Sequence, residues 1–484
     1  MKKIIETIKK KWIKDTLSTI IMFLLLLALV IGINVLTQAL DIPDIDVTKN
    51  QLFTLSESSK NQIKAIEEEI KIYLIGFDED TAIVDLSKQY TKQNSNIQTQ
   101  VIADINQRAD LKVRYGITDE TQLIIIETAK DSKVLTIEDL YTYDYTNYQQ
   151  IDISEEKITN AIVDLTKQEK PKIYFLTGHN EYSLTNELTL LNAYLTNEVN
   201  DVKTLDLLVN GDIPDDTNLL VIGSPQKDFI EQEVELINNY IKKGGKILWL
   251  SDPMLTQASF PNMQKILDQF GVTIEDGIIL EQDENKMALQ SPNYIIPNIA
   301  TTNATKNIAT DGGILLVNAT KLTLANDEAL EQLNIDAQVI LTTSNTALFR
   351  KEVANTSPSK ISSDEEGSFI IGVKLDKTIN QEQEEKKATM YVISNNFFVA
   401  DYPVNIGNNQ VSPISFYNNK DYILNTIAEL TENENAISIR KDTGIIAYTA
   451  TEAQDKLIKL AITIFPISII TIGIVIWIIR KRKK

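Results

Sequence analysis

The sequence predicts an α/β protein whose globular body is bounded at each end by a membrane-spanning helix. Residues 16–40 and 460–479 contain no charged side chain. Each run is long enough for a hydrocarbon core, which needs about 20 apolar residues. Between the two runs, short apolar strands alternate with amphipathic helices, a pattern typical of parallel sheets covered by helices. These observations predict transmembrane helices over 16–40 and 458–479 and an α/β fold between them.

The charges beside the two runs predict the orientation in the membrane. Residues 1–15 hold six lysines and two acids, and residues 480–484 are all basic. Because Lys and Arg close to a span stay on the cytoplasmic side, both tails should be cytoplasmic and the body extracytoplasmic. This describes a two-pass protein of the cell membrane. A cleaved signal peptide is the alternative for residues 16–40, but its apolar run would be about 7–15 residues long.

Composition excludes several classes of protein. The net charge is −20; the segments 1–40 and 456–484 carry +4 and +7, so residues 41–455 carry −31. Such a surface repels nucleic acid. The chain has no cysteine and one histidine, His179. Disulfides, thiol nucleophiles and histidine-based zinc sites are therefore excluded, and we expect no metal and no cofactor.

The first part of the body, residues 41–169, reads as a thioredoxin-like domain. Its expected elements follow the order β-α-β-α-β-β-α after an initial helix, and the paired cysteines of redox-active members are absent. The ranges are helix 57–69, strand 70–77, helix 81–93, strand 97–104, helix 109–117, strands 122–127 and 133–137, and helix 155–168.

Residues 170–281 predict a doubly wound parallel-sheet domain, because buried strands alternate there with helices. A β-rich insertion is expected over 282–401, and 402–457 returns to the α/β body and leads into the second span. The expected strands of the parallel sheet are 172–176, 201–208, 219–223, 246–250 and 272–280, and the helices are 185–198, 232–243 and 261–270.

A candidate ligand site lies where three of these strands end. Gly178, His179 and Glu181 follow the first strand, and Ser224 and Asp252 follow two others. In open parallel sheets, ligands bind beyond the carboxyl ends of the strands. The residues could also be ordinary strand-to-helix turns, or a catalytic His, Ser and acid. No G-x-S-x-G elbow surrounds Ser224, so no catalytic residue is assigned.

A nucleotide site of the P-loop type is excluded. Residues 240–246 are lysine- and glycine-rich, but no G-x-x-x-x-G-K-[ST] motif occurs in the chain. A helix that ends in glycine before the next strand explains this segment. Any ATP hydrolysis must therefore be the work of a partner.

Several stretches together resemble the GldG-like, gliding-motility type of auxiliary subunit of ABC transporters. They are residues 46–56, 174–181, 240–253 and 392–397, followed by the second span with its basic end. Members of that family usually have Gly-His-Gly-Glu where this chain has Asn180. The resemblance implies an extracytoplasmic subunit beside an ABC permease and a separate cytoplasmic ATP-binding subunit. It also implies an α/β domain similar to a class I glutamine amidotransferase that lacks the catalytic cysteine.

The sequence thus predicts a non-catalytic, membrane-anchored accessory subunit of an ABC transporter, with export as the expected direction. One alternative is a cell-surface module that binds a sugar or an envelope fragment in a cleft beside His179. Another is a membrane-bound hydrolase or amidotransferase that uses His179, Ser224 and Asp252.

Overall fold

The computed structural model describes Leu24 and residues 54–433, apart from 119–121, 145–148, 167–168, 254–259, 307, 309–312, 382–383 and 407–408. Both predicted spans, Leu24 excepted, and both basic tails lie outside these residues. Within the described part of the chain, no helix is long and apolar enough to cross a membrane.

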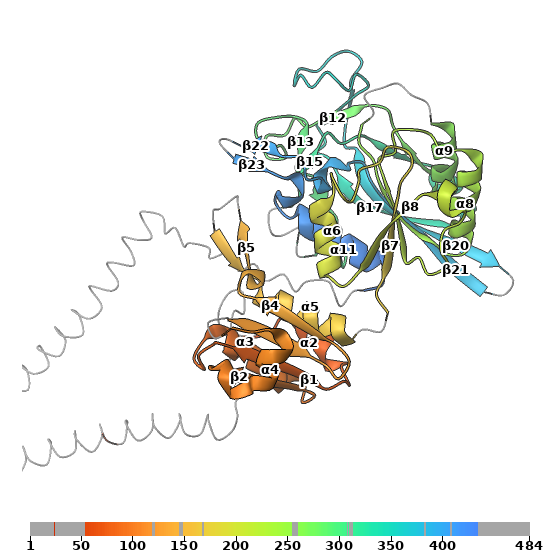
Figure 1. Ribbon diagram of the computed structural model, residues 1–484. Helices are drawn as coiled ribbons and strands as arrows, with labels where there is room; N and C mark the ends of the chain where they lie inside the picture. The colour runs from red at the N-terminus through yellow and green to blue at the C-terminus, as the bar shows by residue number, and fades with distance from the viewer. Residues whose placement is uncertain are drawn as a thin grey trace, which may run out of the picture.

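The N-terminal part of the body contains a four-stranded mixed sheet in the order β2-β1-β3-β4 (Figure 1). Strand β1 is parallel to β2 and antiparallel to β3, and β3 is antiparallel to β4. The order of strands and helices along the chain is the predicted one, with an additional hairpin, β5–β6. The elements are α2 (Glu57–Lys64), β1 (Ile70–Ile75), α3 (Ala82–Gln93), β2 (Ile97–Ile102), α4 (Ala109–Tyr115), β3 (Leu123–Glu127), β4 (Ser132–Thr136), β5 (Tyr141–Asp144), β6 (Gln149–Asp152) and α5 (Ser154–Thr166).

The two faces of this sheet are covered unequally. Alternate residues of β1, such as Ile72 and Leu74, pack against α2, α3 and α5. Tyr73 and Ile75 point to the other face and pack against α4. Helix α4 has only seven residues and ends at Gly116, whose φ of 62° is left-handed. It therefore leaves the end of this face near the register pair Lys71–Glu127 uncovered.

The beginning of the described body is fixed to its closing helix, α5. The backbone N–H of Ser56 and the hydroxyl of Ser59 both donate to Oε1 of Glu155, each at 2.7 Å. Glu155 is buried, and Leu55 is buried in the same core. These contacts attach the start of the described body to α5.

The larger sheet has ten strands among the described residues, and five neighbouring strands are parallel. Helices α6 and α11 pack on one face, and α8 and α9 on the other (Figure 1). The mixed α/β class with parallel strands is therefore confirmed. The five strands, in spatial order, are β8 (Asp201–Leu205), β7 (Lys172–Leu176), β9 (Leu219–Gly223), β10 (Lys246–Leu250) and β21 (Glu384–Ile393); the helices are α6 (Thr189–Asn197), α7 (Leu207–Asn210), α8 (Glu231–Lys242), α9 (Pro261–Leu267) and α11 (Asn419–Leu430).

Strands from the region expected to be a β-rich insertion lie in this same sheet. Strand β21 extends the parallel part beside β10, and β20 pairs with β21 in an antiparallel hairpin. The other strands continue outward from β20 or form small separate sheets. Their ranges are β13 (Tyr294–Ile295), β14 (Asn298–Ile299), β15 (Leu316–Val317), β16 (Leu322–Leu324), β17 (Ile335–Thr342), β18 (Leu348–Arg350), β19 (Glu365–Glu366), β20 (Ile370–Gln381), β22 (Val404–Ile406) and β23 (Asn409–Val411), with helix α10 (Asp327–Gln332) between β16 and β17.

The single strand expected over 272–280 is instead two strands in different sheets, so that prediction was wrong. Strand β11 (Val272–Ile274) pairs with β16, and β12 (Ile278–Leu280) pairs with β18. The break falls next to Gly277, where a Cβ atom would lie 2.4 Å from the ring of Phe349. The segment Glu275-Asp276-Gly277 separates the two strands, and this polar turn sequence was a signal that could have divided the predicted strand.

Candidate functional site

The carboxyl edge of the larger sheet brings the predicted site residues into one region. From β7 the chain moves outward to β8 and then returns to β9 on the other side of β7. Ligands in open α/β sheets bind at such a switch point. His179 follows β7 and Ser224 follows β9, so they lie on the two sides of it.

His179 lies between two carboxylates. Its Nε2 atom is 3.0 Å from Oε2 of Glu233, and its Nδ1 atom is 3.3 Å from Oε1 of Glu181. All three side chains are buried, with His179 itself only 6% exposed. The ring of Phe229 packs against the imidazole, with centroids 4.6 Å apart. We call this group the histidine clamp: His179, Glu181 and Glu233.

The clamp joins the turn after β7 to the first turn of α8. Oε2 of Glu233 also accepts the backbone N–H of Ile230, which precedes the helix, at 2.9 Å. Oε2 of Glu181 accepts the backbone N–H of His179 at 2.7 Å. The carboxylates raise the pKa of His179, with Glu181 as the main cause, whereas burial opposes the shift. The charged imidazolium is thus favoured in the folded protein.

Ser224 and Asp252 form a second group at the same edge. The hydroxyl oxygen of Ser224 accepts the backbone N–H of Asp252 at 3.1 Å. Oδ1 of Asp252 accepts the backbone N–H groups of Asn396 and Phe397, at 2.7 and 2.9 Å, in the turn after β21. Its Oδ2 atom accepts the hydroxyl of Tyr182 at 3.1 Å. Burial raises the pKa of Asp252, although these donors act in the opposite direction.

The two groups do not form a catalytic triad. Each ring nitrogen of His179 faces a carboxylate, so neither is directed at the Ser224 hydroxyl. Gln226 connects the two groups instead. Its backbone N–H donates to the His179 carbonyl at 2.8 Å, and its side-chain Nε2 donates to the hydroxyl oxygen of Ser224 at 3.3 Å. The arrangement can hold the edge of the sheet together, but it lacks a base for a serine nucleophile.

Left-handed backbone conformations shape both turns. Gly178 has φ 122°, Asn180 has φ 63° and Ser224 has φ 53°. Glycine adopts such angles freely, and asparagine tolerates them better than most other residues. Asn180 can therefore occupy the position where the resembling family usually has glycine.

The sequence analysis did not predict several residues that lie at this edge of the sheet. Glu233 is the third residue of α8, where a glutamate often accepts the N–H that precedes the helix, and that pattern could have identified it. Tyr182 lies three residues after His179 but belongs to no motif. Asn395 and Asn396 lie in the resembling stretch 392–397, but their contacts with Asp252 were not expected, because β21 was assigned to an insertion. Asn396 is fully buried beside Gly223, and its side-chain amide has no hydrogen-bond partner among the described residues.

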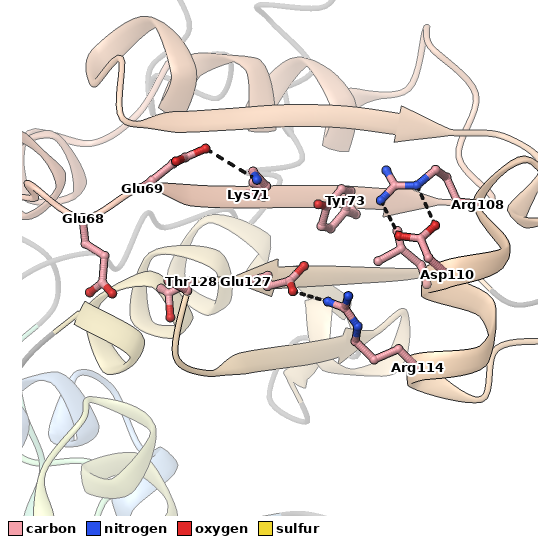
Figure 2. A pocket seen from close by; sticks show the side chains of 11 residues that line it. Glu68, Glu69, Lys71, Tyr73, Arg108, Asp110, Arg114, Glu127 and Thr128 are labelled. Carbon is pink, nitrogen blue, oxygen red and sulfur yellow. Dashed lines mark hydrogen bonds and ion pairs between the residues drawn. The ribbon is translucent and has the colours of Figure 1, made fainter.

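A groove of about 310 Å³ lies in the N-terminal part of the body, on the uncovered end of the four-stranded sheet (Figure 2). Tyr73 and Lys71 of β1 and Glu127 of β3 form its floor, and residues at and before α4 form one wall. Arg108 donates to both carboxylate oxygens of Asp110, at 2.8 and 2.9 Å. Its guanidinium carbon lies 5.1 Å from the centre of the Tyr73 ring. No sequence motif indicated this groove.

No metal site was expected, and the described residues contain no group of three or more His, Cys, Asp or Glu side chains placed to hold a metal ion. The histidine clamp has suitable ligand types, but its two carboxylates contact opposite nitrogens of the ring. They therefore do not converge on one point.

Comparison with known proteins identifies the class of protein. The family model described as "ABC-type uncharacterized transport system" matches residues 170–426, which is more than half of the chain. The protein therefore belongs to this family, whose members are auxiliary components of ABC-type transport systems. No curated protein matches the sequence.

Two solved structures show slight similarity. The N-terminal domain of mmIFT52 has 14% identity and a TM-score of 0.37, and the match covers 54% of this chain and 97% of that one. A ThuA-like protein from Parabacteroides merdae has 10% identity and a TM-score of 0.30, with coverage of 55% and 91%.

The histidine clamp predicts a specific pH dependence of stability. Because the folded pKa of His179 is raised above the ordinary value of 6.5, its contribution is complete below about pH 6.5 and is lost as the pH rises through the folded pKa. Urea unfolding of the full-length protein, followed by tryptophan fluorescence, to which the buried Trp249 contributes, should show this loss from about pH 6 to about pH 9. His179→Gln should lower stability at pH 6 by about 3–5 kcal/mol, since two buried carboxylates lose their cation.

The difference between wild type and His179→Gln should shrink as the pH rises. A difference that stays constant across this range, or that grows with pH, contradicts a charged histidine in the clamp.

Proposed function

We propose that this protein is a non-catalytic accessory subunit of an ABC transporter, anchored in the membrane at both ends with its body outside the cytoplasm. It would work beside a separate permease and a cytoplasmic ATP-binding subunit, in the manner of GldG-like proteins, and export is the direction we favour. The observation that carries the proposal is the family match over residues 170–426, which covers the whole sheet with its histidine clamp.

Two features of the chain support the non-catalytic part of the proposal. The sheet edge where a catalytic group would act is occupied by carboxylates paired with His179 and with backbone N–H groups. The chain has no cysteine to serve as the nucleophile of an amidotransferase. ATP hydrolysis is assigned to a partner, because no phosphate-binding loop is present in the sequence.

For the fold we propose finer assignments on the same basis. The strand order β2-β1-β3-β4, with β3 antiparallel to its neighbours, supports a thioredoxin-like N-terminal domain. The parallel strands with helices on both faces support a domain similar to class I glutamine amidotransferases.

Single-cysteine labelling tests the proposed topology, and the natural absence of cysteine makes the experiment clean. Lys130→Cys places a thiol on a side chain that is 81% exposed in the body, and Lys484→Cys places one at the end of the C-terminal tail. A maleimide that cannot cross membranes should label intact cells at position 130 and not at position 484. After permeabilisation, both should react. If intact cells were labelled at position 484 and not at position 130, the opposite topology would hold and the proposed one would be wrong.

Co-purification tests the transporter assignment. Full-length protein isolated in a mild detergent should bring down a multispan permease and an ATPase. A variant in which 16–40 and 460–479 are replaced by leucine-alanine spans of the same length is the matched control, and should lose the permease. If the wild-type protein emerges alone even after crosslinking, the assignment fails.

A further inference from the structure

The groove on the four-stranded sheet has an uneven distribution of charge. Figure 2 shows Glu68 and Glu69 at one end and Arg108 and Arg114 at the other. Tyr73 lies between the ends, and the register pair Lys71–Glu127 crosses the middle. The groove is thus acidic at the end where β1 begins, and contains both arginines together with the carboxylate of Asp110 at the end next to α4.

The charged groups differ in how tightly they are held. Arg108 is fixed by its fork to Asp110 and by its contact with the Tyr73 ring. Arg114 is half-exposed, and a single one of its nitrogens donates to Glu127. At the acidic end each carboxylate has a loosely paired lysine: the ammonium of Lys71 lies 3.5 Å from Oε1 of Glu69, and that of Lys130 lies 3.8 Å from Oε1 of Glu68.

Exposed pairs of this kind contribute little to stability, about 0–1 kcal/mol. Exchanging such a partner for a charged group of a ligand therefore costs the protein little. Arg108 in the wall, in contrast, is held by two hydrogen bonds to Asp110 and by the Tyr73 ring of the floor, and a side chain ordered before binding limits the entropy lost on binding. The groove combines a fixed wall with exchangeable charges at its two ends.

We propose that this groove binds a short peptide with free ends, of about three residues, in an extended conformation. Its ammonium group would lie at Glu68 and Glu69, and its carboxylate at Arg114. Arg114 donates to Glu127, which is in register with Lys71, two residues after Glu69. This step corresponds to about 7 Å along the strands and about 5 Å across them, and an extended tripeptide spans about 10 Å. The volume of about 310 Å³ is at the small end of the range for ligand pockets.

The net charge of the body favours a zwitterion over an anion. Residues 41–455 carry −31, so a free anion is repelled at long range, whereas a zwitterion carries no net charge. The proposal depends on the groove and not on the transport role, so its failure would leave the proposed function unaffected.

Calorimetric titration of the full-length protein in detergent with tri-L-alanine tests the proposal. Acetylating the amino end or amidating the carboxyl end of the peptide should each weaken binding by about tenfold or more, because each removes a charge-assisted contact. Arg114→Gln and the double change Glu68→Gln with Glu69→Gln should do the same to the unmodified peptide.

Lys64→Gln and Asp85→Asn are the matched controls. Both side chains are exposed on helices that cover the opposite face of the same sheet, and both should leave the affinity unchanged. Equal binding of the capped and free peptides would overturn the proposal, as would no binding at millimolar peptide. Binding of inorganic phosphate that depends on Arg114 and excludes the peptide would show a plain anion site instead.

Discussion

The pairing of buried charge at the carboxyl edge of the larger sheet is the constraint on which this structure depends. Glu233 and Glu181 are removed from water at the switch point, and a buried carboxylate without a partner costs several kcal/mol. His179 supplies the charge that both need. Because Glu233 belongs to α8 and His179 follows β7, the same interaction sets how the helix after β9 lies against β7, the strand next to the β8 edge of the sheet.

The neighbouring carboxylate, Asp252, fixes the turn after the last parallel strand, β21, in a similar way. It binds the backbone of the turn after β21, whose residues lie more than 140 positions further along the chain. The edge that holds substrates in many α/β enzymes is therefore occupied by the protein's own polar groups. This agrees with an auxiliary component of an ABC-type transport system. In the N-terminal groove, by contrast, charged groups remain exposed to solvent.

Much of the fold could be predicted from the sequence because its buried strands are continuous apolar runs bounded by glycine and proline. The strands β7, β9 and β10 fall within a residue of their predicted ranges for this reason. The positions of His179, Ser224 and Asp252 at strand ends followed from the same pattern. Their contacts did not, since the partners Glu233, Tyr182 and Asn396 are brought near by the order of strands in the sheet. Strand β21 could not be placed beside β10, because no local pattern encodes a pairing across more than a hundred residues.

The charge state of His179 tests this view of the sheet edge most directly, and the protein has a single histidine, so one set of resonances reports it. An NMR pH titration of the full-length protein labelled at histidine gives the pKa of the imidazole. We expect a pKa above the ordinary value of 6.5 that falls when Glu181→Gln removes the main cause of the shift. A pKa at or below 6.5 that does not respond to Glu181→Gln would contradict a clamp held by charge.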